Sequence, residues 1–118
     1  MLSEIAKSAE SAPQTLLYKI KNRLATLADE NEACTNPMWA FYFAMNVEGA
    51  NIEKCEEAAC KDPYRAYYFA LGIKGANIEK CQEAACKDPK YAYWFAHDIK
   101  GANIDKCRKA CKGTEYAF

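Results

Sequence analysis

The chain has 118 residues, enough for one domain, and its 16 basic and 16 acidic side chains leave no formal net charge. Nucleic-acid-binding domains usually carry a basic excess, so this balance argues against nucleic acid as the partner. Its apolar runs fall far short of the about 18 residues that a membrane span requires, and no secretory signal is visible at Met1. We therefore expect a soluble, cytoplasmic protein that does not bind membranes.

The first 34 residues differ from the rest and predict an N-terminal helical cap (residues 1–34). Two helices are expected in it, Ser3 to Ala9 and Gln14 to about Glu30. The second helix would have an apolar face at helical spacing, formed by Leu17, Ile20, Leu24 and Leu27.

From residue 35 the sequence repeats every 26 residues. The tetrapeptide Gly-Ala-Asn-Ile begins at Gly49, Gly75 and Gly101. A fixed period of this length indicates units that bury their apolar faces only by stacking on one another. Residues 35–118 therefore predict three repeats followed by a truncated fourth, which begins at Gly113. The expected fold is all-α, a short α-solenoid of three helical hairpins with an N-terminal helical cap.

Each unit begins with Asn or Asp followed by Pro, which is typical of a helix N-cap and first helical position. The first helix of each hairpin, helix A, should start at Pro37, Pro63 and Pro89 and run about twelve residues. The following glycine would end it in a left-handed conformation. Helix B should then start after Asn51, Asn77 and Asn103 and span Ile52–Cys60, Ile78–Cys86 and Ile104–Cys111.

The core side of helix A is predicted by apolar residues at i, i+3, i+4 and i+7. In the first unit these are Ala40, Phe43, Ala44 and Val47, and the other units match them. In helix B the equivalent set is Ile52, Cys55, Ala59 and Cys60.

Several positions opposite the core side of helix A differ between units. A column of large aromatic residues runs along this outer face, flanked by further rings. Two interpretations are open: helix A is buried on several sides by its neighbours, or the rings form an exposed partner-binding surface. The partner-binding residues under the second interpretation are Met38, Tyr42, Met45, Tyr64, Tyr68, Leu71, Trp94 and His97.

Seven cysteines follow the repeat, with Cys111 one residue early, as if the third unit had lost a residue. Two cysteines five apart on a helix diverge by about 140°, which suits shared zinc ligation poorly. We expect core packing, with disulfide formation and metal binding as alternatives. Cys34 should be the freest thiol, and the thiols expected to be buried and reduced are Cys55, Cys60, Cys81, Cys86 and Cys107.

No catalytic constellation is visible. His97 is the only histidine, Asp98 beside it should point elsewhere on the helix, and no nucleophile can be paired with it. There is no glycine-rich phosphate loop, paired-carboxylate motif or dinucleotide fingerprint. We expect no enzyme activity, no cofactor and no metal.

The segment Asp88-Pro89-Lys90-Tyr91-Ala92-Tyr93-Trp94-Phe95-Ala96, followed by Gly-Ala-Asn-Ile, resembles a loosely defined class of short helical repeats in bacterial and phage proteins. The resemblance covers about residues 35–118. It implies an all-helical fold without a specific activity. Cysteine in helix B is a departure from the leucine or valine of that class.

Two functional hypotheses follow. The first is a protein-binding repeat module; by analogy with small phage proteins, it would inhibit a host defence complex by steric occlusion, in the host cytoplasm. The alternative is a cysteine-rich metal-binding or redox-sensing protein.

The C-terminal end of the array is expected to expose parts of Ile99, Ile104 and Cys107. Such an apolar end needs a cover. Either Tyr116 and Phe118 fold back onto it, or a second copy covers it in a two-fold homodimer.

Overall fold

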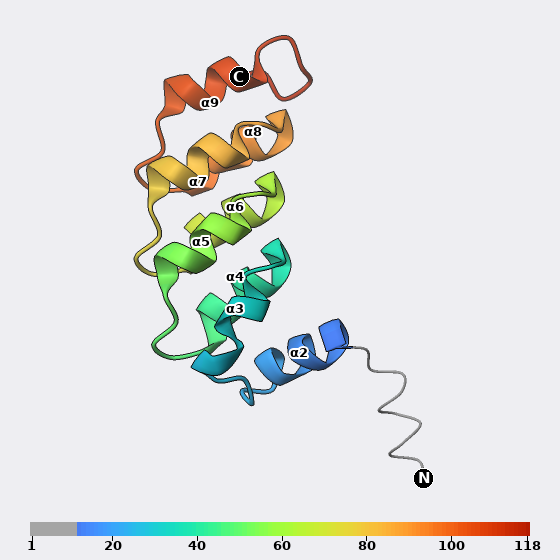
Figure 1. Cartoon of the computed structure of the whole chain (residues 1–118). Helices are drawn as coiled ribbons and strands as arrows, with labels where there is room; N and C mark the ends of the chain where they lie inside the picture. The colour runs from blue at the N-terminus through green and yellow to red at the C-terminus, as the bar shows by residue number, and fades with distance from the viewer. Residues whose placement is uncertain (1–11) are drawn as a thin grey trace.

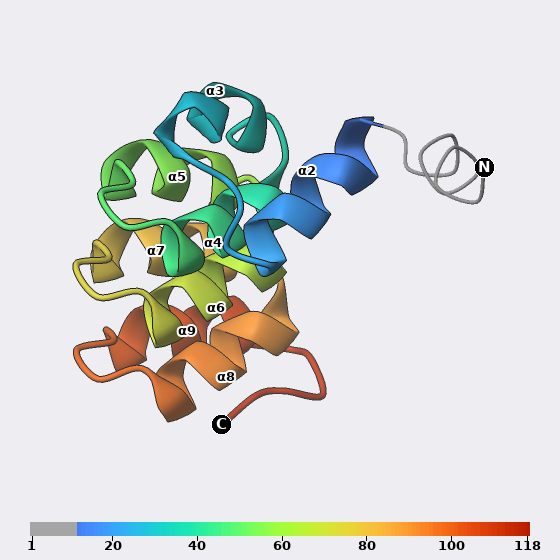
Figure 2. The ribbon, with the colours of Figure 1, turned by 90° about the horizontal axis from the view of Figure 1, so that it is seen from below.

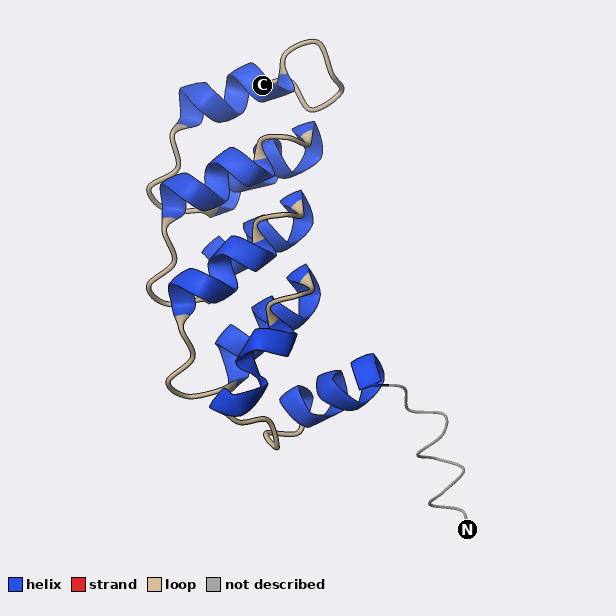
Figure 3. Cartoon of the chain, viewed as in Figure 1, coloured by secondary structure: helices blue, strands red, loops and turns tan. Residues whose placement is uncertain are grey.

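The structure, a computed structural model, describes residues 12–118, which contain helices and no strand (Figure 1). The predicted all-α class is confirmed, and the helices pack in sequence order in a solenoid-like stack (Figure 3). The predicted helix from Ser3 to Ala9 lies outside the described residues. The helices are α2 (Ala12–Lys21), a 3-10 helix η1 (Leu27–Asp29), α3 (Glu30–Ala33), α4 (Pro37–Asn46), α5 (Ile52–Ala59), α6 (Pro63–Gly72), α7 (Ile78–Ala85), α8 (Pro89–Asp98) and α9 (Ile104–Cys111).

The predicted helix starts are confirmed in all three hairpins. Asn36, Asp62 and Asp88 cap α4, α6 and α8, each accepting a hydrogen bond from the main-chain N–H two residues later. Proline then occupies the first helical turn, where its missing N–H leaves no hydrogen bond unmade. The caps of α5, α7 and α9 are equally regular and come from Asn51, Asn77 and Asn103.

Helix A ends two residues earlier than predicted, at Asn46 in the first unit. Val47 follows in an extended conformation and remains buried, so its side chain anchors the connection to the core. Its carbonyl then accepts a hydrogen bond from Ala50 N–H, which closes a four-residue turn. Gly49 is the third residue of that turn, with φ +84°. The glycine therefore serves this turn and does not itself cap the helix.

The helices form two layers (Figure 2). The helix-A layer contains α4, α6 and α8, and the helix-B layer contains α3, α5, α7 and α9. Between them lie Phe43, Phe69 and Phe95, fully buried against small alanine and cysteine side chains. Burial of each phenylalanine stabilises the fold by about 1.5–3 kcal/mol. The predicted core stripe of helix A is thus confirmed, with Ala44 partly exposed.

A second repeated contact, which was not predicted from the sequence, joins each unit to the next. The Glu56 side chain is only 3% exposed, although it lies on helix B of a surface array. Its carboxylate accepts a hydrogen bond, at 2.6 Å, from the main-chain N–H of Asn77, the cap of the next helix B. Glu30 and Gln82 do the same for Asn51 and Asn103, each at 2.7 Å. Three equivalent hydrogen bonds therefore set the spacing of the helix-B layer.

The predicted helix from Gln14 to about Glu30 is wrong, because the chain turns in the middle. Helix α2 ends at Lys21, and Arg23 adopts a left-handed φ of 62°. Thr26 and Asp29 then form a capping box, which starts a new helix. Of the predicted apolar face Ile20 is buried, whereas Leu24 and Leu27 are exposed. The capping box at Thr26 and Asp29 therefore determined where the helix begins, although the leucine spacing predicted one continuous helix.

The end of the array keeps the 26-residue register, so the predicted loss of a residue is wrong. Thr114 N–H bonds to the carbonyl of Cys111, as Asp88 N–H bonds to that of Ala85. Cys111 therefore occupies the place of a buried alanine and is itself buried. Tyr116 and Phe118 fold back against Tyr93, with ring centroids 6.0 and 5.7 Å away.

The predicted exposed end is partly corrected by this fold-back. Cys107 and Ile99 are buried, and Ile104 alone of the three is exposed. Among the described residues, the contacts of Tyr116 and Phe118 correspond to the fold-back version of the prediction. Homodimer formation stays a prediction.

Candidate functional site

The eight residues predicted to bind a partner all lie on α4, α6 and α8. Met45, Leu71 and His97 are equivalent positions near the ends of these helices, and all three are exposed. Tyr64 and Trp94 are also exposed, whereas Met38, Tyr42 and Tyr68 are partly buried. The aromatic column is thus partly packed between units and partly open to solvent.

The boundary between α4 and α6 is filled by a cation. The Arg65 guanidinium lies 4.5 Å from the ring centroid of Tyr64 and 5.7 Å from that of Tyr42. It also lies 5.8 Å from the Phe41 ring. A guanidinium over aromatic faces gains cation–π attraction while its stem covers apolar surface. This boundary is therefore closed by its own side chains.

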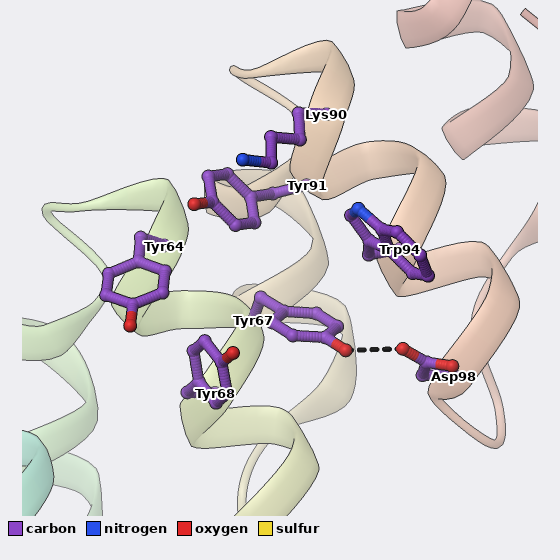
Figure 4. A pocket seen from close by; sticks show the side chains of 7 residues that line it. All are labelled: Tyr64, Tyr67, Tyr68, Lys90, Tyr91, Trp94 and Asp98. Carbon is purple, nitrogen blue, oxygen red and sulfur yellow. Dashed lines mark hydrogen bonds between the residues drawn. The ribbon is translucent and has the colours of Figure 1, made fainter. Parts of the chain in front are cut away.

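The boundary between α6 and α8 is open, and it forms the tyrosine groove (Figure 4). Tyr91 stands where the preceding boundary has Arg65. Its ring centroid lies 5.5 Å from that of Tyr64 and 6.1 Å from that of Tyr67. The cavity holds about 400 Å³ and is lined by Tyr64, Tyr67, Tyr68, Lys90, Tyr91, Trp94 and Asp98.

One end of the groove is polar. The Tyr67 hydroxyl donates to one carboxylate oxygen of Asp98, and the other oxygen lies 2.9 Å from His97 Nδ1. The hydrogen bond from His97, then the one from Tyr67, lowers the pKa of Asp98. Burial, with the same bond to Asp98, raises the pKa of Tyr67. At neutral pH the pair is therefore a carboxylate and a neutral hydroxyl.

The contact between His97 and Asp98 contradicts the prediction that these neighbours point apart. Asp98 is the last residue of α8. There both side chains are free of a following helical turn, so they can bend toward each other.

Four residues of the groove lie outside the predicted partner-binding set: Tyr67, Lys90, Tyr91 and Asp98. A signal was present in the comparison of units. Phe41, which lacks a hydroxyl, lies 31 residues before Gly72 of the next unit, which lacks an acceptor. Tyr67, which has the hydroxyl, is followed by Asp98, which has the acceptor. The hydroxyl and the carboxylate therefore appear together, 31 residues apart, and the structure places them in contact.

The cysteines are free thiols in the structure. Cys55, Cys81 and Cys107 are fully buried, as predicted, whereas Cys60 and Cys86 are partly exposed because they lie just past the ends of their helices. Within residues 12–118 no group of three or more His, Cys, Asp or Glu side chains is arranged to hold a metal ion. In the same part of the chain, no helix is long and apolar enough to cross a membrane.

Comparison of the chain with protein-family models, with curated proteins and with solved structures finds no match.

Proposed function

We propose that this protein is a non-catalytic binding module that holds an extended peptide segment of another protein in the tyrosine groove. The observation that supports the proposal is the open boundary between α6 and α8, lined by five aromatic rings. The equivalent boundary between α4 and α6 is filled by Arg65, so an open groove is not a requirement of the stack.

Aromatic side chains suit this role because they offer large contact area at a small cost in side-chain entropy. Four tyrosines and a tryptophan in one groove resemble the composition of binding surfaces more than that of a water-exposed helix face. Leu71, about half exposed on α6, adds apolar area to the same face.

The size and polarity of the groove favour a peptide segment. A cavity of about 400 Å³ accepts a few side chains and excludes a folded domain. The Lys90 ammonium, 5.6 Å from the Tyr91 ring centroid, supplies a donor. The Asp98 carboxylate accepts from Tyr67 and contacts His97, and its further lone pairs can accept from a peptide N–H. A donor and an acceptor are the two groups that the main chain of an extended peptide needs. Apolar side chains of the segment would lie on the rings between them.

The identity of the partner stays a prediction. A host defence complex that is inhibited by steric occlusion is compatible with a module that binds without reacting.

The test uses Trp94 as a probe. The only other tryptophan is Trp39, so Trp39→Phe leaves a single indole, at the groove. Peptides selected from a displayed random library on this variant should change its fluorescence on titration. Tyr91→Ala should weaken binding by at least about tenfold, which corresponds to about 1.4 kcal/mol.

The matched control is Leu24→Ala, which removes an exposed apolar side chain from the segment between α2 and η1, outside the helices that form the groove. It should bind as the parent does. Equal losses in both variants, or selected peptides that leave Trp94 fluorescence unchanged, would contradict the proposal.

A further inference from the structure

Three pairs of cysteine sulfurs lie in contact across the helix-B layer. The Sγ–Sγ distance is 4.0 Å for Cys34–Cys55 and 3.9 Å for both Cys60–Cys81 and Cys86–Cys107. In each pair, the first cysteine follows the end of one helix and the second lies in the next helix of the same layer. Within a hairpin the cysteines diverge, but between hairpins they meet, which the sequence spacing alone did not reveal.

The two members of each pair differ in the same way. Cys55, Cys81 and Cys107 are fully buried, while Cys34, Cys60 and Cys86 are partly exposed. A small oxidant therefore reaches the partly exposed sulfur of each pair first, and the buried sulfur is in contact with it. This is the arrangement of an attacking thiol and a resolving thiol.

We propose that the three pairs are oxidation sites at which a hydroperoxide converts each dithiol into a disulfide between successive hairpins. The sulfurs must approach from about 4 Å to the bonded distance of about 2 Å, which side-chain rotation and small helix shifts supply. The proposal is independent of the tyrosine groove, which lies in the other layer.

The reaction balances with the peroxide as the only oxidant. The thiolate of the partly exposed cysteine attacks one peroxide oxygen and the O–O bond breaks. The released hydroxide, or the alkoxide from an organic hydroperoxide, takes a proton and leaves as water or an alcohol. The resulting sulfenic acid is attacked by the buried sulfur. The S–S bond forms as the S–O bond breaks, and the buried thiol's proton leaves with the hydroxide as water.

Charge near the pairs acts on the first step in both directions. Lys54, Lys80 and Lys106 each precede the buried cysteine and act to lower the pKa of the partly exposed partner, whereas Glu30 and Glu56 act to raise the pKa of Cys34 and of Cys60. The contact with the Cys81 sulfur leaves the pKa of Cys60 below its ordinary value. Burial outweighs these effects at Cys34 and Cys86, and it raises the pKa of both thiols.

The seventh cysteine supplies an internal control. Cys111 is fully buried, and its thiol donates to the main-chain oxygen of Pro89 at 3.3 Å. Burial raises the pKa of Cys111, and Cys86 lies near enough to raise it further by charge. Among the described residues, however, no sulfur makes with Cys111 the contact that is seen in the three pairs. It should remain a thiol when the other six have reacted.

The bridges would tie the helix-B layer into one covalent series, from α3 through α5 and α7 to α9. Each bridge joins residues 21 positions apart and so restricts the unfolded chain. The oxidised array should be more resistant to heat and to proteases than the reduced one.

The test treats the folded, reduced protein with hydrogen peroxide, removes the excess, and counts free thiols after denaturation. The count should fall from seven to one. Digestion without reductant should yield peptides linked through Cys34–Cys55, Cys60–Cys81 and Cys86–Cys107, and dithiothreitol should restore all seven thiols.

Cys60→Ser should abolish one link and leave the other two, with helix content by circular dichroism as the check on folding. Cys60 is partly exposed, so serine is a mild change there. Higher oxidation without links, scrambled or intermolecular links, or linkage only after denaturation would overturn the proposal. Loss of all three links in a folded Cys60→Ser protein would also overturn it, because the pairs would then not be separate sites.

Discussion

The helix-B layer and the outer face of the helix-A layer differ in how strictly they repeat. In the helix-B layer, each boundary has the same cysteine contact and the same hydrogen bond from a Glu or Gln side chain to the next cap. On the outer face of helix A, one boundary is closed by Arg65 and the next is the open tyrosine groove. One layer repeats its contacts and the other changes them.

This difference indicates that the two layers have different structural roles. Contacts that recur unchanged fix the spacing and orientation of the hairpins, since every unit must stack in the same way. Once that layer holds the array, side chains on the other face are free to differ. Variation between units of a single chain therefore locates a candidate binding surface without any related sequence.

The strongest test of the comparison removes a ring between the layers. Phe69 is fully buried, so Phe69→Ala should destabilise the protein by about 3–5 kcal/mol, through lost burial and the remaining cavity. Urea denaturation followed by circular dichroism measures this. A loss below about 1 kcal/mol would show that the layers do not depend on this ring.

A second test concerns the recurring hydrogen bond in the helix-B layer. Glu56→Ala leaves the N–H of Asn77 without its acceptor and should cost about 1–3 kcal/mol. Glu56→Gln should cost much less, because Gln82 makes the same hydrogen bond at the next boundary. The matched exposed control is Glu57→Ala. If Glu56→Ala and Glu57→Ala have equal unfolding free energies, this hydrogen bond does not hold the layer.

The sequence predicted the regular part of the fold well, for reasons that are local. Asn36 with Pro37 defines a helix start through one side chain and one ring, and neither depends on the rest of the molecule. The positions of Phe43, Phe69 and Phe95 follow from helical spacing. The break after Lys21 was missed because the leucine spacing predicted one continuous helix, whereas a capping box at Thr26 and Asp29 starts a new one within the same residues.

The site was predicted only in part, because it depends on contacts between units. Tyr42, Tyr68 and Trp94 were predicted to lie on the outer face of helix A; Trp94 is exposed and the two tyrosines are partly buried. Spacing along one helix does not show which neighbour fills a boundary. Arg65 and Tyr91 occupy equivalent positions, and only the three-dimensional contacts show that one closes its boundary and the other lines a groove. The cysteine pairs were missed for the same reason.

A third test sharpens the contrast between the two boundaries of the helix-A layer. The pKa of Tyr67 is raised in the folded state, so its contribution to stability is complete below the unfolded value of about 10. It is lost as the pH rises from there through the folded pKa. The stability advantage of the parent over Tyr67→Phe should therefore shrink between pH 9 and pH 11, approximate limits set by that unfolded value.

Unfolding free energies across this range measure the effect, with Tyr18→Phe, at an exposed position on α2, as the control. A constant difference between the parent and Tyr67→Phe would show that the bond to Asp98 makes no contribution.

The smallest expected effect separates binding from packing on the outer face. Trp94 is 38% exposed and its ring contacts those of Tyr93 and His97, so Trp94→Ala should cost about 1 kcal/mol of unfolding free energy, well below the cost of Phe69→Ala. The same substitution should weaken peptide binding by at least about tenfold, because it removes one wall of the groove. Both quantities are measured on one preparation, by urea denaturation and by isothermal titration with a selected peptide. If Trp94→Ala costs as much stability as Phe69→Ala and leaves affinity intact, the ring belongs to the packing of α6 against α8. The outer face would then be a structural layer like the other, and variation between units would no longer mark a binding surface.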